Sequence, residues 1–215
     1  DNSNTAVLWE ALTGREVARI THESSVDSVA FSPDGKYVIS GSDDNTARVW
    51  EALTGTEVAR MTHDDGVSSV AFSPDGKYVV SGGYDNTARV WEALTGTEVA
   101  RMTHDNSALD NSVHSVAFSP DGKYVISGSE DNTARVWEAL TGTEVARMIQ
   151  DYPVYSVVFS PDGKYIVSDN SNTAVLWEAL TGREVARITH ESSVDSVAFS
   201  PDGKYVISGS DDNTA

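Results

Sequence analysis

The chain lacks cysteine, long apolar runs and any excess of basic residues. Zero Cys in 215 residues excludes disulfide bonds and thiolate metal sites. No apolar run approaches the ~20 residues of a membrane-spanning helix. Only 15 Lys and Arg residues oppose 33 Asp and Glu residues, which gives a formal net charge of −18. Because such a surface repels phosphate groups and anionic lipid, we expect the protein to bind neither nucleic acid nor membranes.

The negative charge supports two interpretations. It can keep a sheet-rich protein from associating edge to edge, or it can attract a basic partner. Otherwise the composition is ordinary for a soluble globular protein, with 39% hydrophobic and 22% charged residues. The sequence does not identify a compartment; among those open to a soluble protein, we favour the cytoplasm.

Two motifs recur along the chain. Ser-Pro-Asp-Gly-Lys-Tyr and a Trp-Glu pair each occur five times, and successive Trp residues lie 41, 41, 46 and 40 positions apart. A period in this range is typical of solenoids, propellers and arrays. Residues 1–47 and 169–215 are identical, at an offset of 168. This duplication indicates recent or engineered amplification, and we expect the chain to be a window from a longer array.

Each unit is expected to contain four short strands. In the unit that begins at Val26, the expected strands are Val26–Phe31, Tyr37–Gly41, Ala47–Glu51 and Glu57–Met61. Pro-Asp-Gly after the first strand suits a type I turn, because Pro fixes φ and Gly accepts a positive φ. No stretch with helical spacing competes, so the pattern predicts a meander of four antiparallel strands.

The whole unit resembles the WD40 repeat. The Pro-Asp-Gly turn, Ser-Gly-Ser, the turn Asp and the Trp all fall at that family's offsets, and the likeness covers the entire chain. Trp-Glu stands where the family has Trp-Asp, and Thr-His where it has Gly-His. The resemblance implies an all-β, WD40-like β-propeller with four-stranded antiparallel blades. The chain then holds five blade-equivalents, with the first strand of each lining a central channel.

We expect residues 1–215 to form a single WD40-like propeller or propeller fragment. The expected parts are a third-and-fourth-strand pair at 1–25, units at 26–66, 67–112, 113–153 and 154–193, and a first-and-second-strand pair at 194–215. Three arrangements stay open. The two ends can pair into a fifth blade, two chains can share a ring of about ten blades, or the native chain can be longer.

The resemblance also implies a buried hydrogen-bonded set of His, Ser, Asp and Trp in each blade. A buried indole N–H, an imidazole and a hydroxyl must in any case find partners. The matching residues are His22, Ser40, Asp44 and Trp50; His63, Ser81, Asp85 and Trp91; and His104, Ser127, Asp131 and Trp137. The next unit has Gln150 and Ser171 at the His and Asp positions, and a turn one residue shorter. We expect this fourth blade to be the least stable.

The recurring Ser, His and Asp could suggest a hydrolase, but a set that repeats in three units and includes Trp is typical of internal bracing. Equivalent His residues of different blades lie too far apart to share a metal. The Asp-rich turns lack calcium-loop spacing, and no phosphate-binding loop is present. We therefore expect no catalytic residue, no metal site, no cofactor and no enzyme activity.

The differences between units gather in two kinds of loop. The first-to-second and third-to-fourth turns are constant, whereas the fourth-to-first loops and second-to-third turns vary. The variable loops lie together on one face of a meander ring, which the WD40 resemblance identifies as the usual partner surface. The candidate partner-binding residues are Asp27, Tyr84, Ala108, Leu109, His114, Glu130, Tyr152, Tyr155 and Asp195. Aromatic residues among them are the expected binding hot spots.

Two functions follow from these observations. The first is a non-catalytic interaction scaffold that binds a protein or peptide, for which a basic partner would suit the charge. The alternative is a structural or engineered self-assembling propeller module without a separate ligand, forming a homo-oligomer through shared blades. The exact 47-residue duplication favours this alternative. Tyr152 and Tyr155 could also serve only to pack beside the fourth blade.

Overall fold

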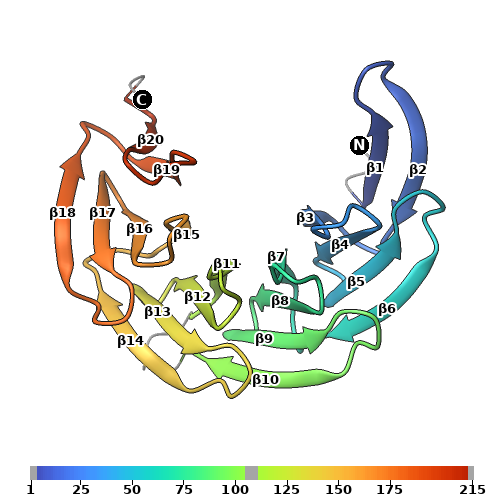
Figure 1. The fold of residues 1–215 in the computed structure, drawn as a ribbon, viewed down its shortest axis with the longest axis horizontal. Helices are drawn as coiled ribbons and strands as arrows, with labels where there is room; N and C mark the ends of the chain where they lie inside the picture. The colour runs from blue at the N-terminus through green and yellow to red at the C-terminus, as the bar shows by residue number, and fades with distance from the viewer. Residues whose placement is uncertain (1–3, 105–110, 213–215) are drawn as a thin grey trace.

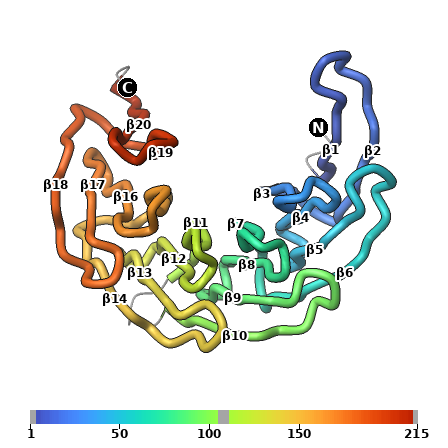
Figure 2. The backbone as a smooth tube through the Cα atoms, viewed as in Figure 1, coloured from blue at the N-terminus to red at the C-terminus, as the bar shows by residue number. Residues whose placement is uncertain are grey.

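The structure, a computed structural model, describes residues 4–104 and 111–212. The regular secondary structure of these residues consists of β-strands alone. The strands form small antiparallel sheets that follow one another around an open arc (Figure 1). The backbone trace shows the same arc, with the two chain ends at its tips (Figure 2). In the described residues no helix is long and apolar enough to cross a membrane. The predicted all-β architecture of four-stranded antiparallel blades is therefore confirmed.

Four sheets are complete blades whose strands pair in chain order. The first contains β3 (Val26–Phe31), β4 (Tyr37–Ser42), β5 (Thr46–Glu51) and β6 (Glu57–Thr62). The second contains β7 (Val67–Phe72), β8 (Tyr78–Gly83), β9 (Thr87–Glu92) and β10 (Glu98–Thr103). The third contains β11 (Val113–Phe118), β12 (Tyr124–Ser129), β13 (Thr133–Glu138) and β14 (Glu144–Ile149). The fourth contains β15 (Val157–Phe159), β16 (Tyr165–Asn170), β17 (Thr173–Glu178) and β18 (Glu184–Thr189).

Two half-blades complete the described chain. They are the pair β1 (Thr5–Glu10) and β2 (Arg15–Thr21), and the pair β19 (Val194–Phe199) and β20 (Val206–Ser210). The sequence left open whether these ends pair with each other. In this structure they do not: each is a separate two-stranded sheet, and the two face each other across the opening of the arc (Figure 1).

The constant turn between first and second strands is held by its own side chains. Gly35 adopts a φ of 71° and donates its N–H to the carbonyl of Ser32 at 2.9 Å. The Ser32 hydroxyl donates to Asp34 at 2.8 Å and accepts the N–H of Tyr37 at 2.9 Å. The same bonds recur in the other four Ser-Pro-Asp-Gly turns. This local chemistry explains why the sequence pattern located the turn correctly.

The apolar core lies between successive blades. Ile39 and Met61 of the first blade are buried against Val67 and Trp91 of the second. The backbone at Gly41 comes so close to the second blade that a Cβ there would meet a Val67 methyl at 2.9 Å. Contacts between neighbouring blades are therefore a main source of stability in this fold.

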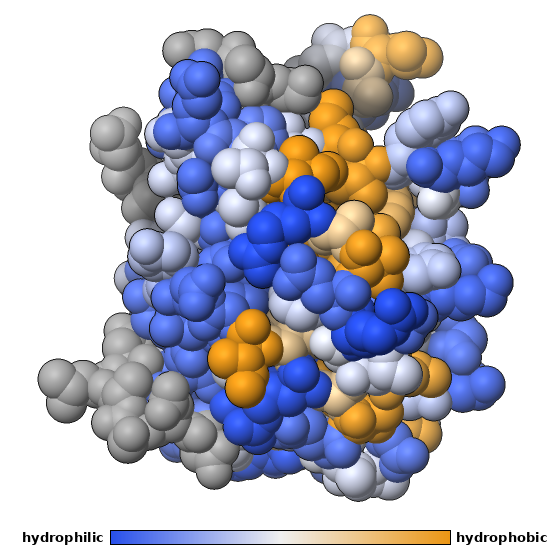
Figure 3. Space-filling view, turned by 90° about the vertical axis from the view of Figure 1, so that its left-hand side faces the viewer, coloured by the Kyte–Doolittle hydropathy of each residue, from blue (hydrophilic) through white to orange (hydrophobic). Residues whose placement is uncertain are grey.

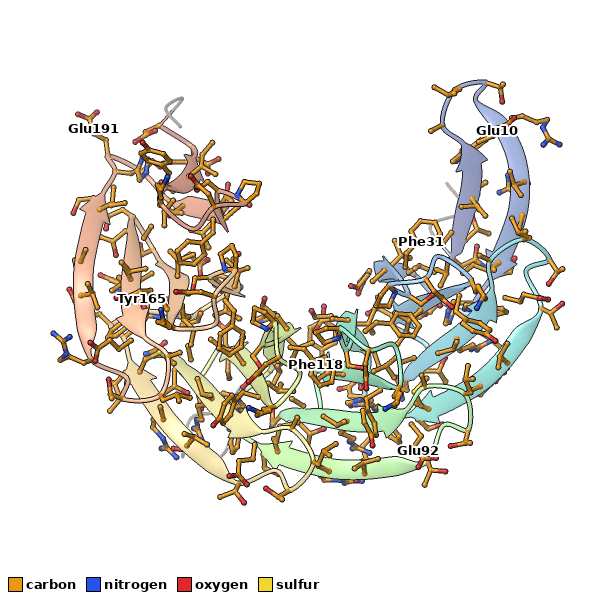
Figure 4. The ribbon with its side chains drawn as sticks, viewed as in Figure 1. Glu10, Phe31, Glu92, Phe118, Tyr165 and Glu191 are labelled. Carbon is orange, nitrogen blue, oxygen red and sulfur yellow. The ribbon has the colours of Figure 1, made fainter. Side chains whose placement is uncertain are left out.

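The opening of the arc leaves apolar side chains exposed at both tips. Val29 of β3 is 54% exposed, whereas Val70, at the same position of the second blade, is 6% exposed. Ile188 of β18 is 46% exposed, whereas the matching Met148 is 1% exposed. Figure 4 shows Phe31, also exposed, at the inner end of the first complete blade. From the side of β18 the surface is mostly hydrophilic, interrupted by a band of apolar residues (Figure 3).

Candidate functional site

The His–Ser–Asp–Trp residues of each complete unit meet at the boundary between two blades. His104, just after the second blade, donates its Nδ1–H to the Asp131 carboxylate of the third blade at 3.0 Å, and its Nε2 is hydrogen-bonded to the Ser127 hydroxyl at 2.7 Å. The Trp137 indole N–H donates to the same Ser127 hydroxyl at 2.8 Å. Equivalent bonds join His22, Ser40, Asp44 and Trp50, and His63, Ser81, Asp85 and Trp91. These side chains are satisfied internally, so the arrangement braces the blades and offers no open nucleophile.

Two further residues of this cluster were missed from the sequence. Arg135 donates to Asp131 at 2.5 Å and to the Thr133 hydroxyl at 2.9 Å, and it is buried. Burial alone would raise the pKa of Asp131, but hydrogen bonds from His104 and Thr133 and the Arg135 charge lower it well below its ordinary value. The available signal was Thr-Ala-Arg-Val-Trp, which three units share and the fourth replaces with Thr-Ala-Val-Leu-Trp.

The fourth blade holds a reduced version of the cluster. Gln150 and Trp177 both donate to the Ser168 hydroxyl at 2.9 Å. Within the described residues, Gln150 Oε1 and Asn170 Oδ1 are buried without a hydrogen-bond partner. Such orphaned acceptors cost about 1–3 kcal/mol each. After the fourth blade, His190 occupies the His position of the cluster and is hydrogen-bonded to Ser208 at 2.7 Å. His190 was not among the cluster residues expected from the sequence.

On the face of variable loops, three aromatic side chains from successive blades form a continuous row. Tyr84 meets His114 edge to face with ring centroids 6.2 Å apart, and His114 meets Tyr155 at 4.8 Å. Glu130 accepts hydrogen bonds from His114 at 2.9 Å and from the Tyr155 hydroxyl at 3.4 Å. Tyr84 is 38% and Tyr155 52% exposed, so both Tyr rings are open to solvent, whereas His114 between them is half-buried. We call Tyr84, His114, Glu130 and Tyr155 the aromatic row.

Carboxylates flank the Tyr84 end of the aromatic row. Burial raises the pKa of Asp27, and the charge of Asp43 and a hydrogen bond with it raise it further. Burial, then Asp27, Asp43 and Asp65, raises the pKa of Tyr84. Asp43 and Asp65 were absent from the candidate residues of the sequence analysis. The sequence feature that could have predicted them is their position in the variable loops, which also carry the candidate residues.

The other candidates lie outside the row. Ala108 and Leu109 fall outside the described residues. Tyr152 and Asp195 are exposed on the variable loop and strand that follow the third and fourth blades, and the ring contacts do not include them. The structure thus groups four of the nine predicted partner-binding residues in the row and places Asp27 beside it.

Asp169 holds the backbone that carries Tyr155. It is buried on β16, at the position that is Gly41 in the first blade, and its Oδ1 accepts the N–H groups of Tyr155 at 2.9 Å and Ser156 at 3.0 Å. β15 has three residues where the other first strands have six, so the carboxylate replaces part of the lost strand pairing. Burial raises the pKa of Asp169 to about 6 despite these bonds.

The described residues contain no cluster of three or more His, Cys, Asp or Glu side chains placed to hold a metal ion. On this face the geometry places exposed Tyr rings beside carboxylates. Rings give large contact areas at low entropy cost, and carboxylates add charge specificity.

The radial series of four-stranded meanders defines the class of the protein as a β-propeller assembly of repeated blades. The sequence matches the family described as "WD domain, G-beta repeat" over residues 14–51, 55–92, 98–138, 144–178 and 182–215. The chain belongs to the WD40 repeat family. WD40 domains generally act as non-catalytic scaffolds that bind proteins or peptides.

Among solved structures, the chain is similar to a crystal structure of the computationally designed Ika8 protein in space group P63. The sequence identity is 29% and the TM-score is 0.84. The match covers 99% of this chain and 64% of the designed one, so this chain spans about two-thirds of that protein's length. The comparison with curated proteins gave no match. These findings agree with a WD40-like propeller built of near-identical blades.

Proposed function

We propose that the protein is a non-catalytic scaffold that binds a protein or peptide on the face carrying the fourth-to-first and second-to-third loops. The observation that carries this proposal is the aromatic row, in which rings from three successive blades touch and the two Tyr rings remain exposed. Scattered loop substitutions would not be expected to place contacting rings on neighbouring blades. Exposed Tyr residues at the centre of a patch are also frequent binding hot spots.

We predict that the triple substitution of Tyr84, His114 and Tyr155 by Ala abolishes the enrichment of peptides in a random-peptide display selection. Selected peptides should lose at least tenfold in affinity for the triple variant, which corresponds to about 1.4 kcal/mol. The matched control replaces Leu94, Leu140 and Leu180 by Ala.

These control residues are also exposed and apolar, but they belong to the third-to-fourth turns on the opposite face. Enrichment should therefore be unchanged in the control variant. Peptides that bind the wild type and the Tyr84, His114, Tyr155 triple variant equally well would contradict the proposed face.

A second candidate function, assembly through shared blades, is supported by complementary groups at the two tips. Trp9 of β1 is 53% exposed, whereas Trp177, in the identical segment of the fourth blade, is 5% exposed and donates to Ser168. In the other half-blade, Ser208 of β20 occupies the position that Ser168 has in the fourth blade. A β19–β20 pair from a second copy would thus complete the β1–β2 pair, and burying Trp9, Val29 and Ile188 would stabilise each junction by several kcal/mol.

Measurement of the solution mass of the 215-residue chain tests the assembly. A head-to-tail contact of this kind gives closed rings or open chains, so we expect masses at multiples of 23.1 kDa that rise with concentration. Trp9→Ala should shift the protein toward 23.1 kDa, whereas Leu12→Ala, on the exposed turn of the same hairpin, should not. A monomer at all concentrations up to tens of micromolar would exclude assembly as the function.

A further inference from the structure

We propose that the Tyr84 end of the aromatic row binds an arginine side chain of the partner peptide. We call Asp27, Asp43, Asp65 and Tyr84 the acidic corner. The inference rests on the proposed function, because it names the chemistry of the partner at the same face. It goes further in assigning one type of side chain to one place on that face.

The acidic corner is assembled from four separate segments of two blades. Asp27 lies on β3, Asp43 in the turn after β4, Asp65 in the loop after β6 and Tyr84 in the turn after β8. Gly66 allows this approach, because a Cβ there would meet the Tyr84 ring at 2.9 Å and an Asp43 carboxylate oxygen at 3.1 Å. All four side chains of the corner are exposed, so a ligand can reach them.

The carboxylates of the corner have no cation of their own among the ion pairs of the described residues. Each of the 15 Lys and Arg side chains pairs with a carboxylate, and none of these pairs involves Asp27, Asp43 or Asp65. Instead, the negative charge of Asp43 raises the pKa of Asp27, and the charges of both carboxylates raise the pKa of the Tyr84 hydroxyl. A positive charge supplied by a partner would relieve this repulsion.

The chemistry of the corner fits a guanidinium group better than an ammonium group. A guanidinium is planar, so it can lie against the Tyr84 ring while its N–H groups donate to the neighbouring carboxylates. An ammonium is a strongly hydrated point charge and gains less from the ring. The half-buried ring of His114 and the exposed ring of Tyr155 continue from the corner and can contact the residues that follow the arginine.

Fluorescence anisotropy with three labelled peptides tests the inference. The peptides share a Gly-rich sequence and carry three arginines, three lysines or three citrullines, citrulline being a neutral analogue of arginine with a similar shape. We expect the arginine peptide to bind at least threefold more tightly than the lysine peptide, and the citrulline peptide to show no binding. Tyr84→Ala should remove the preference for arginine over lysine.

Two double variants separate a local site from the general attraction of a protein with a charge of −18. Asp27→Asn with Asp43→Asn removes two charges from the corner and should weaken the arginine peptide at least tenfold. Asp34→Asn with Asp75→Asn removes two charges from the exposed turns of the opposite face and should change affinity less than twofold.

Equal losses in the two double variants, equal affinity for arginine and lysine, or no binding at all would overturn the inference. The display selection distinguishes this failure from failure of the proposed function. Selected peptides that lack arginine but still require the aromatic row would leave the scaffold function in place and remove the arginine site. Selected peptides enriched in arginine that lose affinity in the Asp27, Asp43 variant would support both.

Discussion

Replacing Asp131 with Ala is expected to destabilise the protein by about 3–5 kcal/mol, because it leaves a buried cation without its partner. The Asp131 side chain is fully buried, and its carboxylate binds Arg135, His104 and Thr133. Arg135 is itself 1% exposed, so water cannot replace the lost carboxylate. The measurement is the free energy of unfolding in urea, followed by Trp fluorescence.

Asp121→Ala is the matched control in the same blade. Asp121 is also a carboxylate paired with a cation, Lys123, but the pair is exposed on the constant turn. Exposed pairs contribute about 0–1 kcal/mol, and the lost hydrogen bond from the Ser119 hydroxyl adds about 0.5–1.5 kcal/mol, so this variant should lose clearly less stability than Asp131→Ala. Should Asp131→Ala prove no more harmful than Asp121→Ala, the buried cluster would not be a source of stability between blades.

Replacing Asp169 with Asn is expected to remove a pH dependence of stability between pH 4 and 6. Burial raises the pKa of Asp169 to about 6 in the folded state, from an ordinary value of 3.8. Between these values the folded state binds more protons than the unfolded state, so the free energy of unfolding falls as pH rises. A shift of this size corresponds to about 3 kcal/mol between pH 3 and 7.

Unfolding of the wild type and the Asn variant should be compared across pH 3 to 7. The difference between the two isolates Asp169, because the other titrating groups are common to both proteins. Burial lowers the pKa of His22 and His104, so these side chains favour unfolding as pH falls and act in the opposite direction. Parallel curves for the two proteins would show that Asp169 does not titrate in this window.

Asp169→Gly provides a second comparison, since Gly occupies this position in the first three complete blades. This variant should also lose the pH dependence, because the titrating carboxyl is gone. In addition it leaves the N–H groups of Tyr155 and Ser156 without their acceptor. We therefore expect it to be less stable than the Asn variant at every pH.

The fold could be predicted from sequence because each unit carries its own local instructions. Pro33 and Gly35 define a turn that forms within six residues, and the strand boundaries followed from it to within one residue. The opening of the arc could not be predicted in this way. Whether a half-blade finds a partner depends on contacts between distant segments, and the same local sequence is compatible with a closed or an open ring.

The candidate site was predictable only where the units differ. Tyr84, His114 and Tyr155 stood out because they replace Ser or Asp of other units, and the structure brings them into contact. Asp65 did not stand out, since acidic loop residues are common in this chain. Its place near Tyr84 depends on Gly66, which lets the loop approach the Tyr84 ring, and only the structure shows that approach.

The identical segments at residues 1–47 and 169–215 have a consequence for hydrogen exchange followed by mass spectrometry. Peptides cut from the two copies have the same mass and cannot be separated. However, β17 pairs with β16 on one side, whereas β1 has no such neighbour among the residues that the structure describes. The amides of β1 should exchange faster than those of β17. Such peptides should give a bimodal isotope envelope even when each copy exchanges as one simple population.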